Sequence, residues 1–87
     1  MALYKVEINQ RVRKKDLTSI PTRDADKIIK IIADLAVDPF PSTAIQLKGR
    51  EEWRIRQGDY RILYIVAAEV VTVYVVKVGH RKEVYRK

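Results

Sequence analysis

One stretch near the middle of the chain, Trp53 to Tyr64, constrains the fold more than any other. It reads Trp-Arg-Ile-Arg-Gln-Gly-Asp-Tyr-Arg-Ile-Leu-Tyr, with large apolar and cationic residues alternating on both sides of Gly58-Asp59. This pattern is typical of a β-hairpin whose two-residue turn has Gly in its first central position. Because such a turn fixes the register, we expect Trp53 opposite Tyr64 and Arg56 opposite Arg61.

The predicted register gives the hairpin two unlike faces. One face carries four large apolar residues that are suited to burial, Trp53, Ile55, Ile62 and Tyr64. The other carries three arginines, Arg54, Arg56 and Arg61. Like charges directly opposite each other destabilise a sheet, so a fold that places Arg56 against Arg61 suggests a site for an anion such as RNA phosphate. The alternative is a solvated face on which the arginines spread into water.

The charge of the chain also indicates a polyanionic partner. There are 18 Lys and Arg residues against 11 Asp and Glu, a formal net charge of +7 at pH 7. Residues 44–87 hold 10 of the cations and 5 of the acids, so most of the excess lies in this half. Such a balance favours contact with nucleic acid or with an acidic protein, although a basic surface can also serve solubility alone.

Size and composition exclude several kinds of site. A chain of 87 residues predicts a single domain over residues 1–87, with a thin core and room for a flat or grooved site. The absence of Cys excludes disulfides, thiolate nucleophiles and Cys-based zinc sites, and one His leaves no His-rich metal site. We therefore expect neither a metal nor a small-molecule cofactor. No signal-peptide pattern or membrane-length apolar run is present, so we expect a cytoplasmic protein without a membrane partner.

The first half of the chain predicts a strand followed by two helices. Residues 3–8 alternate as a short strand does, and Asn9 is a suitable N-cap for a helix over residues 10–18. A second helix is expected over residues 23–36. Its apolar stripe at helical spacing consists of Ile28, Ile31, Ile32 and Leu35. The two helices are expected to form an antiparallel pair.

The second half predicts strands. After a short segment over residues 44–47 comes the hairpin, and a second tight turn is expected with Ala68-Glu69 as its central pair. Residues 70–78 are then the most β-prone run of the chain. The order strand-helix-helix-strand-strand-strand predicts an α+β fold, in which two antiparallel helices pack on one face of an antiparallel sheet of about four strands.

The C-terminal tail that follows is short and rich in cations. Gly79 is expected to free the backbone to turn out of the strand. Arg81 and Tyr85 are four residues apart, so one helical turn would bring them onto a common face. His80 titrates near neutral pH by its type, which makes it an acid/base candidate. The alternatives are a frayed, solvated end and a histidine that is simply a hydrogen-bonded turn residue.

Three segments together resemble the RelE/ParE superfamily of toxins from type II toxin–antitoxin modules. They are Leu47-Lys48-Gly49, the hairpin, and Val78-Gly79-His80-Arg81 with the nearby Tyr85. Gly-Asp-Tyr-Arg followed about twenty residues later by Gly-His-Arg is typical of the RelE branch. The resemblance covers nearly the whole chain. It implies a fold like that of small microbial RNases and a ribosome-dependent endoribonuclease that cuts mRNA in the ribosomal A site.

The resemblance also implies roles for individual residues. By position, Arg61 matches the family arginine that stabilises the transition-state phosphate. Arg81 matches the tail arginine assigned to phosphate stabilisation and leaving-group protonation. Tyr85 matches the C-terminal tyrosine that stacks on or orients the substrate. Four further cations are candidates for binding RNA phosphate, Arg54, Arg56, Lys48 and Lys82.

The reaction implied is attack of a 2′-OH on the neighbouring phosphodiester, which builds negative charge on the phosphate oxygens. Preorganised guanidinium groups stabilise that charge. Arg54 and Arg56 stand where the family often has lysines, and an arginine with a pKa above about 12 cannot readily act as a general base. Tyr85, His80 or a group of the substrate is left as the base, and His80 fits best by its chemistry.

The family implies an acidic RelB-like antitoxin as partner, besides mRNA and the ribosome with its rRNA. Two other functions stay open. One is inhibition of DNA gyrase, as in the ParE branch on the same fold, and the other is that of a catalytically inactive RNA-binding relative. The ParE branch generally lacks the catalytic group, so the presence of Arg61, Arg81 and Tyr85 favours the RelE reading.

Overall fold

The computed structural model describes residues 3–80 of the chain. Five strands, one α-helix and two short helical turns follow one another in these residues. In chain order they are β1 (Lys5–Ile8), η1 (Val12–Asp16), α1 (Thr22–Asp34), β2 (Ile45–Gln46), β3 (Trp53–Gln57), β4 (Tyr60–Ala67), η2 (Ala68–Val70) and β5 (Thr72–His80). No helix within residues 3–80 is long and apolar enough to cross a membrane.

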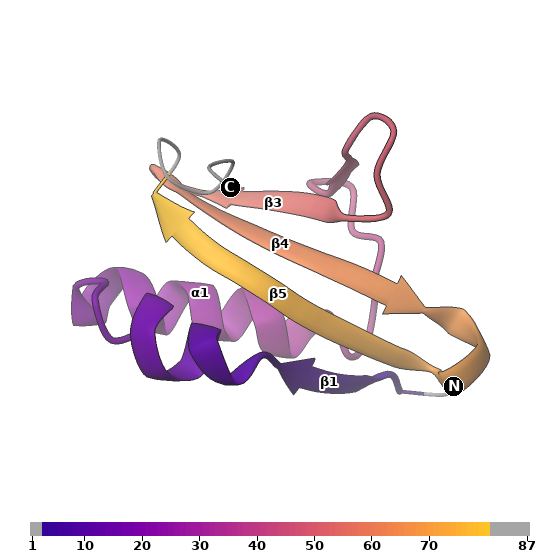
Figure 1. Cartoon of the computed structure of the whole chain (residues 1–87), viewed down its shortest axis with the longest axis horizontal. Coiled ribbons are helices and arrows are strands. Elements are labelled where there is room, and N and C mark those ends of the chain that lie inside the picture. The colour runs from indigo at the N-terminus through magenta and orange to yellow at the C-terminus, as the bar shows by residue number, and fades with distance from the viewer. Residues whose placement is uncertain (1–2, 81–87) are drawn as a thin grey trace.

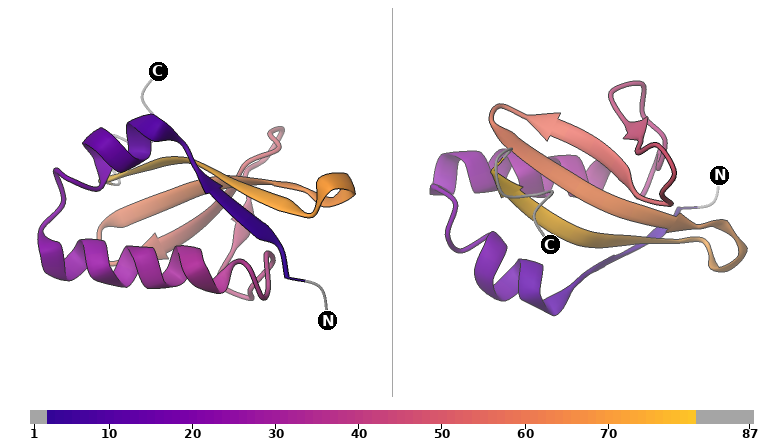
Figure 2. Two further views of the ribbon diagram at one scale, coloured as in Figure 1. Left: turned by 90° about the horizontal axis from the view of Figure 1, so that it is seen from below. Right: turned by 45° about the horizontal axis from the view of Figure 1, so that its top comes forward.

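The strands form one sheet in the order β1-β5-β4-β3-β2, with α1 and η1 on the same side of it (Figures 1 and 2). The predicted α+β class is confirmed. The sheet differs from the prediction in two respects, since it has five strands and β1 pairs parallel to β5. Parallel neighbours need a long connection. Here everything between the first strand and the last serves as that connection, which a strand-by-strand reading of the sequence does not reveal.

The core lies between α1 and the inner face of the sheet. Ile28, Ile32 and Leu35 of the predicted helical stripe are buried, as expected. They belong to one apolar cluster with residues of β3, β4 and β5, namely Ile55, Ile62, Tyr64, Val73, Val75 and Val78. The amphipathic pattern of α1 therefore determines which face of the sheet is covered.

The first predicted helix is present only in part. Asn9 does cap a helical turn, because its Oδ1 accepts a hydrogen bond of 2.8 Å from the backbone N–H of Arg11. The chain then winds into a π-helical turn, η1, rather than an α-helix over residues 10–18. The wider turn is closed by a bond from the N–H of Leu17 to the carbonyl of Val12, 2.9 Å long. π-turns arise from tertiary packing and often occur at functional positions, and residue propensities do not predict them.

Asp16, at the end of η1, joins this turn to β5. Beyond Val75, β1 no longer covers the edge of β5, and the backbone N–H of Val78 instead donates a 3.2 Å hydrogen bond to Asp16 Oδ2. The other carboxylate oxygen lies 3.6 Å from Lys77 Nζ. One side chain thus replaces a neighbouring strand along this part of the sheet edge.

The connection from β4 to β5 is longer than predicted. Ala68-Glu69 is not the central pair of a two-residue turn, because η2 and Val71 together separate the strands. Val71 has a left-handed backbone, with φ of 48°. This backbone region is unfavourable for a β-branched residue, so residue preferences do not predict that the loop ends at Val71. The strand consequently begins at Thr72 instead of Val70.

A β-bulge interrupts the pairing of β4 with β5. Tyr64 pairs with Val75, whereas the preceding residue, Leu63, pairs with Lys77, so Val76 is the extra residue. The bulge reverses the alternation along β5. Val75 points into the core before it and Val78 after it, and both are fully buried.

Candidate functional site

The hairpin has the predicted register. Trp53 pairs with Tyr64, Ile55 with Ile62, and Arg56 with Arg61. Gly58 has a φ of +59°, as the first central position of the predicted turn requires. A local turn therefore sets which side chains share a face.

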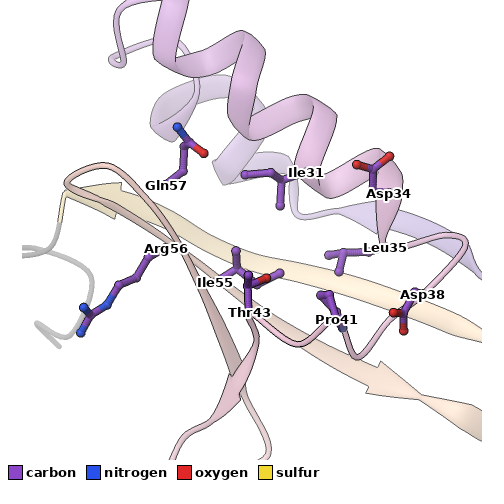
Figure 3. A pocket seen from close by; sticks show the side chains of 9 residues that line it. All are labelled: Ile31, Asp34, Leu35, Asp38, Pro41, Thr43, Ile55, Arg56 and Gln57. Atoms are coloured by element: carbon purple, nitrogen blue, oxygen red, sulfur yellow. The ribbon is translucent and has the colours of Figure 1, made fainter.

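The predicted arginines lie together on the face of the sheet that α1 does not cover. In Figure 3, Ile55 points toward α1, whereas Arg56 points away from it. Since Arg56 pairs with Arg61, both side chains leave this uncovered face, and Arg54 joins them two residues before Arg56. Arg61 is paired on its other side with Gly79 of β5. We call Arg54, Arg56 and Arg61 the arginine row.

Arg61 is the most unusual member of the arginine row. Only 9% of it is exposed, and its buried Nε atom has no hydrogen-bond partner among the described residues. No ion pair within residues 3–80 involves Arg61. A buried cation without a partner is destabilising, and its neighbour across the strands, Arg56, adds repulsion. An anion bound on this face would stabilise the arrangement, because it would offset the positive charge of the two arginines.

His80 lies on the other face of the sheet. It pairs with Tyr60, and the two rings make an edge-to-face contact with centroids 5.9 Å apart. Because neighbouring residues of a strand point to opposite faces, His80 is turned away from Arg61, whose partner is Gly79. It borders a hollow of about 340 Å³ next to Asp16 and Lys77. The structure therefore does not bring His80 together with the arginine row.

The other predicted site residues divide into two groups. Lys48 is exposed in the loop between β2 and β3, which lies at the end of β3 away from the Gly58-Asp59 turn (Figure 1). It does not join Arg56 and Arg61 near the turn. The remaining three predicted residues lie outside the described range, namely Arg81, Lys82 and Tyr85.

A separate pocket of about 310 Å³ lies between α1 and β3 (Figure 3). Ile31, Leu35 and Ile55 form apolar walls, and Asp34 and Asp38 stand at its α1 side. It opens on the helix side of the sheet, whereas the guanidinium of Arg56 points away from it. No cluster of three potential metal ligands occurs within residues 3–80.

Sequence reasoning missed Gly79 as a neighbour of Arg61. We expected a glycine that lets the chain turn, but β5 runs straight through it to His80. Counting residues along the strands could not have paired Gly79 with Arg61, because the bulge at Val76 changes the register between them. The residue type was the one available signal, since a glycine inside a strand often marks a close approach.

Comparison with known families gives a match over almost the whole chain. A family model described as the ParE toxin of the type II toxin–antitoxin system parDE matches residues 6–85. The chain is 31% identical to the RelE1 protein of Methanocaldococcus jannaschii over 87 residues, which cover 95% of this chain and 96% of that protein. It is 28% identical to the toxin RelG of Mycobacterium tuberculosis over 76 residues, which cover 85% and 87% of the two chains.

Solved structures show the same fold. The archaeal RelE–RelB complex of Pyrococcus horikoshii contains a chain that matches with a TM-score of 0.81 and 28% identity, covering 93% of this chain and 98% of that one. The RelBE2 toxin–antitoxin complex of Mycobacterium tuberculosis gives a TM-score of 0.79 at 28% identity, with coverage of 91% and 99%.

Proposed function

Because the chain belongs to the ParE toxin family, within the RelE/ParE superfamily of type II toxin–antitoxin systems, we propose that it is a ribosome-dependent endoribonuclease. It cleaves mRNA in the ribosomal A site and so inhibits translation. The observation that carries this proposal is the arginine row, in which the buried Nε of Arg61 has no hydrogen-bond partner in the described part of the chain. Binding to gyrase does not require such a group, whereas cleavage of a phosphodiester requires a cation that stabilises the negative charge on the phosphate.

The proposed reaction uses positive charge in place of a metal. When the 2′-OH attacks the neighbouring phosphorus, negative charge grows on the non-bridging oxygens, and the 5′-oxygen leaves with a proton. Arg61 stabilises the growing charge, because its guanidinium is fixed before the reaction starts. Arg56 and Arg54 hold the phosphates of the strand. Arg81 and Tyr85 complete the group in this proposal, Arg81 at the leaving oxygen and Tyr85 at the base of the nucleotide.

The general base is not a member of the arginine row, since an arginine does not lose its proton near neutral pH. His80 faces the opposite side of the sheet from Arg61. We therefore assign the base to Tyr85 or to a group of the bound substrate.

An acidic antitoxin is the proposed partner in the cell. The related chains from P. horikoshii and M. tuberculosis were solved in RelE–RelB complexes. A formal charge of +7 and exposed apolar side chains such as Val37, Phe40 and Ile45 give this chain a surface that suits such a partner. Opposite charge speeds the encounter.

The test is cleavage of mRNA on programmed ribosomes, followed by primer extension. We expect Arg61→Ala to reduce the cleavage rate about 100-fold or more, as the loss of one transition-state charge contact does in other enzymes. Arg23→Ala is the matched control, because Arg23 is an exposed arginine on α1. Its rate should equal that of the unchanged chain. Full cleavage by a folded Arg61→Ala protein would refute the proposal.

Inhibition of DNA gyrase is the second candidate, because the family model that matches is that of the ParE toxin. A supercoiling assay separates the two functions. Inhibition of supercoiling without cleavage of ribosome-bound mRNA would establish the second candidate, and the opposite pattern would exclude it.

A further inference from the structure

Gly79 lies inside a strand where its backbone does not require a glycine. It is a residue of β5, and the glycines with positive φ among the described residues are Gly49 and Gly58. A glycine in a strand interior weakens the strand, because it brings no side chain and loses more backbone freedom on folding. Its presence in β5 therefore needs an explanation other than backbone geometry.

The bulge at Val76 determines what Gly79 faces. Tyr64 pairs with Val75 on one side of the bulge, and Arg61 pairs with Gly79 on the other. If the register before the bulge simply continued, Val78 would stand opposite Arg61. Bulges commonly redirect side chains next to active sites. Here the extra residue sends Val78 into the core and leaves a position without a side chain beside Arg61.

Residues of three neighbouring strands then form a row across the sheet. Arg61 lies in the middle, with Arg56 on one side and Gly79 on the other. Side chains directly opposite each other in such a sheet have Cβ atoms about 5 Å apart, so any larger residue at position 79 would stand against the stem of Arg61. Arg61 as a whole is only 9% exposed, and its Nε has no hydrogen-bond partner within residues 3–80. Gly79 is itself only partly covered.

We propose that Gly79 is a positioning residue whose missing side chain leaves space for one RNA phosphate beside Arg61. The phosphate enters over Gly79 and accepts hydrogen bonds from the guanidinium of Arg61, while Arg56 lies on its other side. This inference rests on the proposed function in taking RNA as the ligand. Binding of the phosphate requires neither cleavage nor the ribosome, so the two can be tested apart.

The test uses Gly79→Ala and Gly79→Val, which fill the space in two steps. Affinity for a single-stranded RNA hexamer, made uncleavable by 2′-O-methyl groups, should fall about tenfold in Gly79→Ala and further in Gly79→Val, because charge-assisted hydrogen bonds are lost. The melting temperature should stay the same or rise, because both residues suit a strand better than glycine. A purely structural glycine would give the opposite pattern, with stability lost and affinity kept.

Ala67→Val is the matched control. Ala67 lies on the same face of β4 as Arg61, at the other end of the strand, so the change adds similar bulk away from the arginine row. Its affinity for the hexamer should not change. The ¹H–¹⁵N signal of Arg61 Nε provides a direct readout, since it should shift when the hexamer is added to the unchanged protein and should need a higher concentration in the Gly79 variants.

Unchanged affinity in Gly79→Val, or an Arg61 Nε signal that does not respond to the hexamer, overturns the inference. If the hexamer results are as expected but the unchanged protein cuts no mRNA on ribosomes, the proposed nuclease function fails and the phosphate position stands.

Discussion

Tyr64 shows how one buried side chain joins the sheet to the loop after α1. It is fully buried, and its hydroxyl donates a hydrogen bond of 2.8 Å to the carbonyl oxygen of Pro39. Burial, aided by the nearby carboxylate of Asp38, raises the pKa of Tyr64 from 10.0 to about 12. The folded protein therefore holds this proton more tightly than the unfolded chain does.

We predict that this contribution to stability is present below pH 10 and disappears as the pH rises from 10 to about 12. In that interval the unfolded tyrosine loses its proton first, so the free energy of unfolding falls. Tyr64→Phe removes the titrating group. Its stability should be lower by about 1 kcal/mol at pH 7, the net value of a buried hydrogen bond.

Urea denaturation of both proteins at several pH values checks the prediction. The difference in free energy of unfolding between the two proteins should shrink above pH 10. The titration of the other tyrosines and lysines affects both proteins equally, so it does not contribute to this difference. A difference that stays constant from pH 7 to pH 11 would show that Tyr64 does not carry this effect.

At the scale of a single residue, the sequence predicted the face that Arg61 occupies but not its burial. The face follows from alternation counted from the Gly58-Asp59 turn, which is a local feature. Burial depends on the neighbouring strands, and the register of β5 against Arg61 was hidden by the bulge at Val76.

Among the elements, those fixed by local interactions were predicted best. The hairpin of β3 and β4 has the expected register, and α1 lies within about two residues of its predicted range. The parallel pairing of β1 with β5 and the π-turn η1 were missed. Both depend on contacts between segments far apart in sequence, for which periodicity and propensity carry no information.

The attachment of η1 to β5 gives an element-scale prediction. Asp16→Ala leaves the N–H of Val78 without its acceptor at the edge of the sheet, and it also removes the partner of Lys77. We expect the free energy of unfolding to fall by about 1–3 kcal/mol, the penalty for a polar group left unpaired in a partly buried place.

Thermal unfolding and amide hydrogen exchange measure this effect. The Val78 amide should exchange faster in Asp16→Ala than in the unchanged protein. Asp26→Ala serves as the control, because Asp26 is exposed on α1. An unchanged exchange rate at Val78 would show that Asp16 does not protect the edge of β5.

At the scale of the whole molecule, the formal charge of +7 predicts that the proposed binding to RNA weakens as the salt concentration rises. Each phosphate contact that is lost should lower the slope of log affinity against log salt concentration by about 0.7 for a single strand. Arg56→Ala should show this decrease with the uncleavable hexamer, while Arg23→Ala should keep the full slope. Equal slopes for the two variants would mean that the arginine row makes no phosphate contact at Arg56.

The position of β5 between β1 and β4 also bears on the order of folding. Lys5 of β1 cannot pair with its partner Thr72 until that residue has been synthesised. Contacts between segments so far apart in sequence also form slowly. Until β5 docks, Gly79 is not beside Arg61, so the proposed phosphate position is not yet formed. A nascent chain that stops short of β5 would therefore lack the proposed site, and the nuclease activity proposed above should appear only after the last strand of the sheet has docked.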